Sequence, residues 1–345
     1  MRESIERASI EARQYDLELE RIGETRKEVA RFIGAQVEEI SFTGPTSSGL
    51  NVIANGLDWT SGDEVVCYLD DYPANVYPWL ALERRGVRAV LLEAARIGEI
   101  TPAIVERALT ERTKLVALAS ANFCSGYRID LEAIGALCAD RGVLFSVDAI
   151  QTLGAFPVAL DRIDFLSAGA QKWMLGPSGA GILYVKKSRR DLLRPATIGG
   201  WNVQSRNFIA QREIKYAPGG QKFEPGAYYH SAIAGLGAAI ELLLEVGPEK
   251  ISRRILALTQ ALEHEIAPAG FEILSPGDEN NRSGILTFRH PGIPTDRFFD
   301  ALLKHDAVVS LRFDREDRSW LRVSPHFYNS FDEMATVADV LRREM

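Results

Sequence analysis

The sequence has 345 residues, more than a single compact core usually serves, so we expect two domains. Hydrophobic residues make up 46% of the chain and charged residues 25%. No apolar run approaches the roughly 18 residues of a membrane span, so we expect a soluble protein without a membrane partner. The formal net charge is −7 and the basic residues are scattered, which argues against nucleic-acid binding.

The N-terminal segment and the cysteines bear on the compartment. The first 32 residues are charged throughout, lack the apolar stretch of a signal peptide and contain acidic residues that transit peptides avoid. Cys67, Cys124 and Cys138 form no CxxC pair and have no histidine nearby in sequence, so neither a disulfide framework nor a metal site is indicated. We therefore expect a reduced, cytoplasmic protein.

The apolar pattern predicts an α/β domain. After an opening helix, residues 38–57 predict a strand, a turn and a second helix. Short apolar runs without polar alternation then recur between helical segments, which is typical of a mostly parallel sheet covered on both faces. The predicted fold is a seven-stranded sheet of this kind within residues 25–246, and the later apolar runs are 63–69, 88–93, 114–120, 142–149, 164–169 and 179–185.

The remaining elements predict a second domain. A loop-rich stretch, 199–230, leads to a long helix that ends near residue 247, and mixed strands and helices follow to the C-terminus. We expect residues 247–345 to form a smaller α+β domain, and residues 1–24 to form a helical segment that packs with it. Ser330 and Glu333 have the spacing of a capping box and predict the start of a terminal helix.

One turn has the composition of an anion site. Thr46, Ser47 and Ser48, with Gly44 and Gly49, lie between a predicted strand and a predicted helix. Free amides at a helix start, together with hydroxyl groups, suit a phosphate, although an ordinary helix cap would look the same. The sequence has neither a GxGxxG turn nor a Gly-x4-Gly-Lys-Ser/Thr loop, so neither a dinucleotide nor ATP is indicated.

Two ionisable residues follow neighbouring strands. Asp148 ends one apolar run, at the edge where parallel sheets bind ligands, and Lys172 follows the next run. Taken singly, Asp148 could cap a loop and Lys172 could be a surface charge. Together with the phosphate turn they supply the three contacts that pyridoxal phosphate (PLP) needs: an amine for its aldehyde, a carboxylate for its ring nitrogen and donors for its phosphate.

With these residues in view, the sequence resembles the class V aminotransferase family of fold-type I PLP enzymes. This group holds cysteine desulfurases, isopenicillin-N-epimerase-like proteins and kynureninases. The resemblance runs from about residue 25 to the end, and its motifs occur in family order: SFTGPTSSGLN, DDYPANVYPW, ANFCSG, SVDAIQTLG, GAQKWMLGPSGAGILYV, FEPGAYYHSAIAGLGAA and LRVSPHFYN. It implies a homodimer with the cofactor at the interface and an amino-acid substrate.

The resemblance also implies a role for each site residue. Lys172 would form the Schiff base with PLP and act as the base at the substrate α-carbon, and Asp148 would pair with the ring nitrogen. The other implied contacts are Asn122 and Gln151 to the ring hydroxyl, Thr46 and Ser47 to the phosphate, Tyr72 or its neighbour Pro73 stacked on the ring, Arg322 to the substrate carboxylate, and His230 to the partner subunit's phosphate.

Some positions depart from the family pattern. Gln171 and Gly169 replace residues that many relatives use around the phosphate, so we expect an altered phosphate shell. The chain also begins later than most relatives, so we expect either a wider pocket or a different lid. Desulfurases need a cysteine on a C-terminal loop, and none follows Cys138. We therefore expect an aminotransferase or epimerase-like enzyme. The alternatives are a desulfurase-like or C–S lyase reaction, and a non-catalytic member that keeps only the fold.

Overall fold

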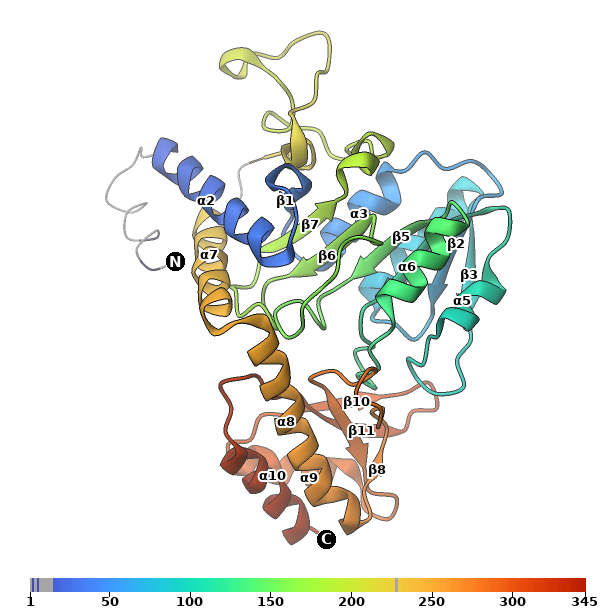
Figure 1. Ribbon diagram of the computed structural model, residues 1–345, viewed down its shortest axis with the longest axis vertical. Coiled ribbons are helices and arrows are strands. Elements are labelled where there is room, and N and C mark those ends of the chain that lie inside the picture. The colour runs from blue at the N-terminus through green and yellow to red at the C-terminus, as the bar shows by residue number, and fades with distance from the viewer. Residues whose placement is uncertain (1, 3–4, 6–14, 227–228) are drawn as a thin grey trace.

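The computed structural model describes residues 2, 5, 15–226 and 229–345, and is shown in Figure 1. Its main feature is a seven-stranded sheet in the order β1-β7-β6-β5-β4-β2-β3. All neighbours from β6 to β3 are parallel, whereas β7 runs antiparallel to both β6 and β1. The predicted mostly parallel sheet is therefore confirmed, with these strands: β1 (Ile40–Phe42), β2 (Glu64–Tyr68), β3 (Arg88–Leu92), β4 (Thr113–Ala119), β5 (Leu144–Asp148), β6 (Phe165–Gly169) and β7 (Gly181–Val185).

Both faces of this sheet are covered, which explains its continuous apolar runs. Every residue of β2, β5, β6 and β7 is buried. Successive residues of each strand enter opposite cores: Val66 and Phe145 belong to the larger core, and Val65 and Leu144 to the smaller one. The larger core is closed by α2 (Tyr15–Ile33), α5 (Pro102–Ala108), α6 (Leu131–Asp140) and α7 (His230–Val246), and the smaller one by α3 (Thr46–Gly56) and α4 (Tyr77–Leu80).

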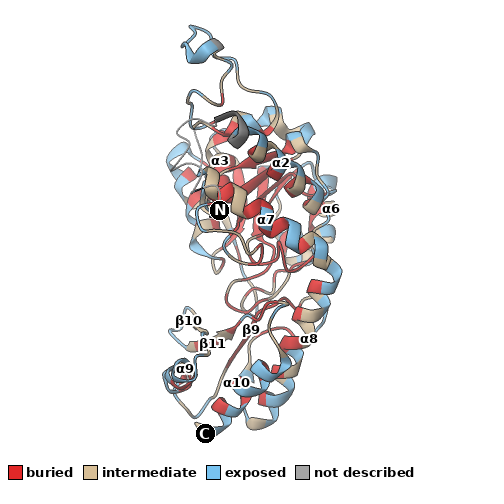
Figure 2. Ribbon diagram, turned by 90° about the vertical axis from the view of Figure 1, so that its left-hand side faces the viewer, coloured by how far each residue is buried: buried red, intermediate tan, exposed pale blue. Residues whose placement is uncertain are grey.

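A second, smaller sheet follows in the chain. Its order is β10-β11-β9-β8, with all neighbours antiparallel. Figures 1 and 2 show it below the large sheet, joined to it by the long helix α8. Its elements are α8 (Pro248–Ile266), β8 (Glu272–Ile273), β9 (Leu286–Arg289), α9 (Thr295–Lys304), β10 (Ser310–Phe313), β11 (Ser319–Val323) and α10 (Phe331–Arg343).

Two predictions about helices can be compared with this structure. The capping box is confirmed, because Ser330 Oγ accepts the Glu333 amide at 3.1 Å and Glu333 accepts the Ser330 amide at 2.6 Å. Residues 1–24 were expected to pack against the small domain. In the structure, α2, which includes residues 15–24, lies along α7 and away from the small sheet (Figure 1). Residues 1, 3–4 and 6–14 of that segment lie outside the described residues.

The helices of the described residues also bear on membrane insertion. No single helix among them is both long and apolar enough to cross a membrane. Only α7 together with residues 248–269 meets that requirement, as a pair bent by 82°.

Candidate active site

Asp148 and Lys172 come together because they follow adjacent strands. Asp148 is the last residue of β5, and β6, its parallel neighbour, ends three residues before Lys172. A tight turn fixes the lysine: the Gly176 amide donates to the Ala170 carbonyl at 2.9 Å, and the Leu175 amide to the Lys172 carbonyl at 3.0 Å. Asp148 is only 2% exposed, and its Oδ1 accepts the Ile150 amide at 3.0 Å.

Burial changes the acidity of both groups. The pKa of Lys172 is lowered to about 8, mainly by burial and next by the charge of Arg322, while Asp148 opposes the change. Burial also raises the pKa of Asp148 to about 6, against the hydrogen bond from Ile150 and the charge of Lys172. Near neutral pH a sizeable fraction of Lys172 is therefore the neutral, nucleophilic amine.

Tyr72 covers the lysine from the side of β2. Lys172 Nζ lies 5.7 Å from the centroid of the Tyr72 ring, and that ring meets Phe123 edge to face at 5.4 Å. Half of Tyr72 is exposed, so its ring is accessible to a flat ligand. Of the two residues considered for stacking, Tyr72 is thus the one shown beside the lysine.

A carboxylate that the sequence analysis missed holds this loop in place. Asp71 is almost fully buried, and its Oδ2 accepts the Ala119 amide at 2.9 Å and Asn75 Nδ2 at 3.2 Å. Burial raises the pKa of Asp71 to about 7, and the nearby Asp148 adds to the increase. Its only sequence signal was an acidic residue shortly after an apolar run, as for Asp148.

The start of α3 is joined to the end of β6. Thr46 Oγ1 accepts the Gly169 amide at 2.8 Å, and Ser167 Oγ donates to the Thr46 carbonyl at 3.0 Å. Ser47, the next residue, is partly exposed, and no side chain caps this helix. The helix start therefore has first-turn amides that no cap uses, at the same sheet edge as Lys172.

Asn122 and Gln151 differ in what they can offer a ligand. Asn122 Nδ2 donates to the Asp70 carbonyl at 2.8 Å, and its Oδ1 accepts the amides of Cys124 and Ser125 at 3.0 Å. Asn122 thus organises the turn 122–126. Gln151, by contrast, has a buried Nε2 with no hydrogen-bond partner in the part of the chain that the structure describes. A buried donor of this kind needs an acceptor.

Arg322 reaches the site from the small sheet, whereas His230 lies at a different cavity of the structure. Arg322 Nη1 donates to the Phe123 carbonyl at 2.6 Å, beside Tyr72. His230 is the first residue of α7 and borders a separate cavity of about 210 Å³ against α2. Tyr72, Asp148, Lys172 and Arg322 are therefore gathered within one chain, and the predicted role of His230 toward a partner subunit remains a prediction.

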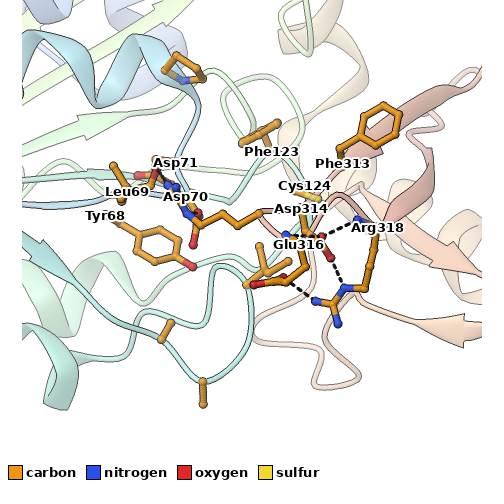
Figure 3. Close-up of a pocket in the computed structure, with 15 residues that line it drawn as sticks. Tyr68, Leu69, Asp70, Asp71, Phe123, Cys124, Phe313, Asp314, Glu316 and Arg318 are labelled. Atoms are coloured by element: carbon orange, nitrogen blue, oxygen red, sulfur yellow. Dashed lines mark hydrogen bonds and ion pairs between the residues drawn. The ribbon is translucent and has the colours of Figure 1, made fainter.

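A cavity of about 580 Å³ opens next to these residues. Figure 3 shows Tyr68, Asp70 and Asp71 on its large-domain side, and Phe313, Asp314 and Arg318 on the side of the β10–β11 hairpin. Arg315 of the hairpin forms an ion pair with Asp70, and its Nη2 donates to the Leu69 carbonyl at 2.9 Å. The cavity thus lies between the two sheets, with the hairpin as one wall.

Comparison with known proteins identifies this arrangement. The family model described as aminotransferase class-V matches residues 11–334. The chain belongs to the class V aminotransferase family. Relatives in it include a probable cysteine desulfurase of Methanothermobacter thermautotrophicus, 30% identical over 336 residues that cover 93% of this chain and 83% of the relative.

Solved structures agree with this membership. The apo cysteine desulfurase of Thermococcus onnurineus NA1 superimposes with a TM-score of 0.88 and 26% identity, covering 96% of this chain and 85% of that one. The cystine C–S lyase C-DES, in complex with its reaction product cysteine persulfide, superimposes with a TM-score of 0.84 and covers 94% and 87%. At 23% identity, the second likeness shows a shared fold alone.

Membership in the class V family makes the protein a PLP-dependent enzyme, and its residues fit that cofactor. Within the described residues, nothing forms a hydrogen bond or ion pair with Lys172 Nζ. Among the described residues, Asp148 is a buried carboxylate whose only nearby cation is that lysine, and Gln151, three residues further along the chain, has a buried Nε2 donor without a partner. These groups would hold the aldehyde carbon, the ring nitrogen and the ring hydroxyl of PLP, respectively.

Gly169 and Gln171, the two residues that depart from the class V pattern, are close to each other in the structure. A Cβ atom on Gly169 would lie 2.4 Å from Gln171 Oε1 and 3.2 Å from Thr46 Oγ1, so a larger residue at position 169 would displace both side chains. Gln171 is exposed. Near Thr46, Gly169 therefore leaves room for the neutral side chain of Gln171, and these two residues make up the expected change of the phosphate shell.

The lowered pKa of Lys172 should make cofactor capture depend on pH. Only the neutral amine attacks an aldehyde, so with a pKa of about 8 the initial rate of PLP binding to apoprotein should rise about tenfold per pH unit below that value and level off above it. Stopped-flow absorbance measures this rate. Arg322→Gln should move the plateau to higher pH, because Arg322 is the largest charge that lowers this pKa. A rate that still rises steeply at about pH 10 in the wild type would contradict the lowered pKa.

Proposed function

We propose that this protein is a PLP-dependent lyase that cleaves the Cβ–S bond of a sulfur-containing amino acid by β-elimination, without a persulfide on the protein. The supporting observation is the position of its thiols. The hairpin residues 314–318, which face the site from the small domain, contain no cysteine, and all three cysteines are buried in the large domain. A relay of sulfur through a mobile thiol therefore has no residue to carry it.

Cys124 is the one thiol beside the cavity, and its surroundings make it a poor nucleophile. Burial raises the pKa of Cys124 to about 11, so the thiol stays protonated at neutral pH. Its backbone is held on both sides: its amide donates to Asn122 Oδ1, and its carbonyl accepts Thr287 Oγ1 at 2.6 Å. A residue fixed in this way cannot travel to the substrate as a carrier.

The relatives support the class of substrate. Curated relatives of this chain are named as probable cysteine desulfurases, and C-DES, which shares the fold, is named as a cystine C–S lyase. Desulfuration and β-elimination both break a bond to the sulfur of the same amino acids. The transamination or epimerisation expected from the sequence has no such support and stays a prediction. A role without catalysis is disfavoured because the amine, carboxylate and amide donor of the site are all present.

The residues of this chain could carry out the elimination as follows. When bound, PLP withdraws electrons from the substrate α-carbon and makes its proton acidic. Lys172, whose pKa of about 8 suits proton transfer near neutral pH, takes that proton. The Cβ–S bond then breaks with its electron pair on sulfur. Addition of water and loss of ammonia leave a 2-keto acid, so cysteine and water give pyruvate, ammonia and hydrogen sulfide.

Product analysis tests the proposal. Holoenzyme incubated with L-cysteine or L-cystine should release pyruvate and ammonia in equal amounts and should form no alanine. Cys124→Ala should keep kcat/KM within about twofold, because the thiol takes no part. Alanine together with a trapped persulfide on Cys124 would instead establish desulfuration. Keto acid with amino-group transfer to a second keto acid, or inverted stereochemistry without sulfide, would establish the transamination or epimerisation branch.

A further inference from the structure

The face of the small sheet that meets the large domain carries three arginines, Arg289, Arg312 and Arg322, and the last two are neighbours in the β10–β11 pair. In the β10–β11 pair, Ser310 lies opposite Arg322 and Arg312 lies opposite Trp320. Because residues two apart in a strand share a face, Arg312 is the diagonal neighbour of Arg322 on the side that contacts Phe123. Leu321, between them in the register, points the other way into the core of the small domain.

Arg312 and Arg322 have no carboxylate partner among the described residues. Arg322 is bound by the Phe123 carbonyl and weakly by Ser310 Oγ at 3.5 Å, and Arg312 donates only to the Leu311 carbonyl at 3.2 Å. The Nε atoms of both are buried and have no hydrogen-bond partner in the part of the chain described. Each guanidinium therefore keeps a free Nε donor, which is one arm of the fork that binds an oxyanion.

Other arginines of the same sheet and hairpin are paired. Arg289 forms an ion pair with Glu272 at 2.7 Å, Arg315 with Asp70, and Arg318 with Asp314 at 2.7 Å. Among the described arginines of this sheet and hairpin, only Arg312 and Arg322 therefore lack a carboxylate partner. The lack of a partner is not a general property of this surface.

Electrostatics indicate that the two side chains lie near each other and near the reactive amine. Arg312 contributes to the lowered pKa of both Lys172 and Arg322, so the three cations share one region. Two half-buried guanidinium groups without counter-ions repel each other, and bound anions remove that cost. Arg312 and Arg322 therefore keep buried donors that an anion bound between the two domains would use.

A single α-carboxylate has two oxygens, which the fork of one arginine satisfies. Arg322 is the residue expected to bind it. We propose that Arg312 binds a second anionic group, on the side chain of the substrate, so that the preferred substrate is an amino acid with an anionic side chain. The inference rests on the proposed function for the reacting bond. Together, the anion site and the proposed elimination indicate S-sulfocysteine as a substrate. S-sulfocysteine and water would give pyruvate, ammonia and thiosulfate, and the electron pair of the Cβ–S bond would leave on thiosulfate.

The first test measures binding with ligands that have no leaving group on Cβ. L-glutamate and L-glutamine have nearly the same shape and differ by one charge, and either can be titrated into holoenzyme by calorimetry or by the visible spectrum. We expect the wild type to bind L-glutamate at least about tenfold more tightly than L-glutamine. Arg312→Gln should remove this preference and leave the affinity for L-glutamine within about twofold.

Two matched variants separate charge from folding. Arg312→Lys keeps the positive charge and should keep part of the preference, although it loses the fork. Arg289→Gln removes an arginine of the same sheet that is already paired with Glu272, and should leave the preference unchanged. Circular dichroism confirms that each variant is folded.

The outcomes distinguish this inference from the proposed function. Equal binding of the two ligands by the wild type would overturn the inference. So would an equal loss for both ligands in Arg312→Gln, because Arg312 would then share the α-carboxylate with Arg322. If the wild type prefers L-glutamate through Arg312 but releases no keto acid from any sulfur amino acid, the elimination is wrong and the anion site stands. If S-sulfocysteine and L-cysteine are consumed with equal kcat/KM in wild type and Arg312→Gln alike, the elimination stands and the anion site is wrong.

Discussion

Lys172→Ala should lower the release of keto acid by about 1,000-fold, because one change removes both the covalent anchor of PLP and the proton acceptor at the substrate α-carbon. The variant should remain folded. No described residue forms a hydrogen bond or ion pair with Lys172 Nζ, and burial disfavours the charged amine, so the loss of Lys172 breaks no hydrogen bond. It removes only the attraction between its charge and the Asp148 carboxylate, which can take up a proton instead. Steady-state assays of pyruvate and the visible spectrum of the purified variant measure the effect.

Borohydride reduction followed by peptide mapping supplies the control for this prediction. In the wild type the reduced cofactor should be found on the peptide that contains Lys172, and in the variant no lysine should carry it. Lys186→Ala is a matched change, since Lys186 follows β7 and, among the described residues, its Nζ donates only to the Asp161 carbonyl, at 2.6 Å. It should leave activity within about twofold. An adduct on a different lysine in the wild type would contradict the assignment.

The large domain could be predicted from the sequence because both faces of its sheet are buried. That burial requires continuous apolar runs, and each predicted run between residues 63 and 185 overlaps one of the strands β2 to β7. The order of the strands could not be predicted in the same way. Residues 179–185 do not indicate that β7 runs antiparallel between β6 and β1, because strand order depends on contacts between distant segments.

The site residues likewise fall into those that the sequence indicates and those that depend on contacts between distant segments. Asp148 and Lys172 could be found because strand ends at one sheet edge converge, so position in the chain indicates position in space. Asp71 has the same signal after β2, but its role depends on the Ala119 amide of the neighbouring strand. Arg312 has no signal at all: it differs from the paired arginines near it only through the β10–β11 register and the contact of that face with Phe123.

Asp148→Asn is expected to have the second largest effect, and its two consequences have opposite signs. An amide keeps the shape of the side chain but cannot balance a protonated ring nitrogen, so the affinity for PLP should fall by about 100-fold. At neutral pH the apoprotein should become more stable. The folded-state pKa of Asp148 is about 6, against 3.8 ordinarily, so its carboxyl favours folding only while protonated, and this contribution is lost as pH rises from about 4 to about 6. The amide carries no such cost.

Cofactor titrations and thermal unfolding across pH test both signs. Wild-type affinity should fall as pH drops below about 6, where Asp148 becomes protonated, and the affinity of Asp148→Asn should lack this acid limb. The unfolding midpoint of the apo variant should rise by about 2 to 4 °C at neutral pH. Asp164→Asn is the matched control, because Asp164 pairs with Arg189 at 2.8 Å and accepts the Phe145 amide at 2.9 Å. This substitution should lower the unfolding midpoint and leave the affinity for PLP unchanged. A less stable apo Asp148→Asn would show that this carboxylate serves the fold, whereas a more stable one with weak PLP binding would show that its buried charge is kept for the cofactor.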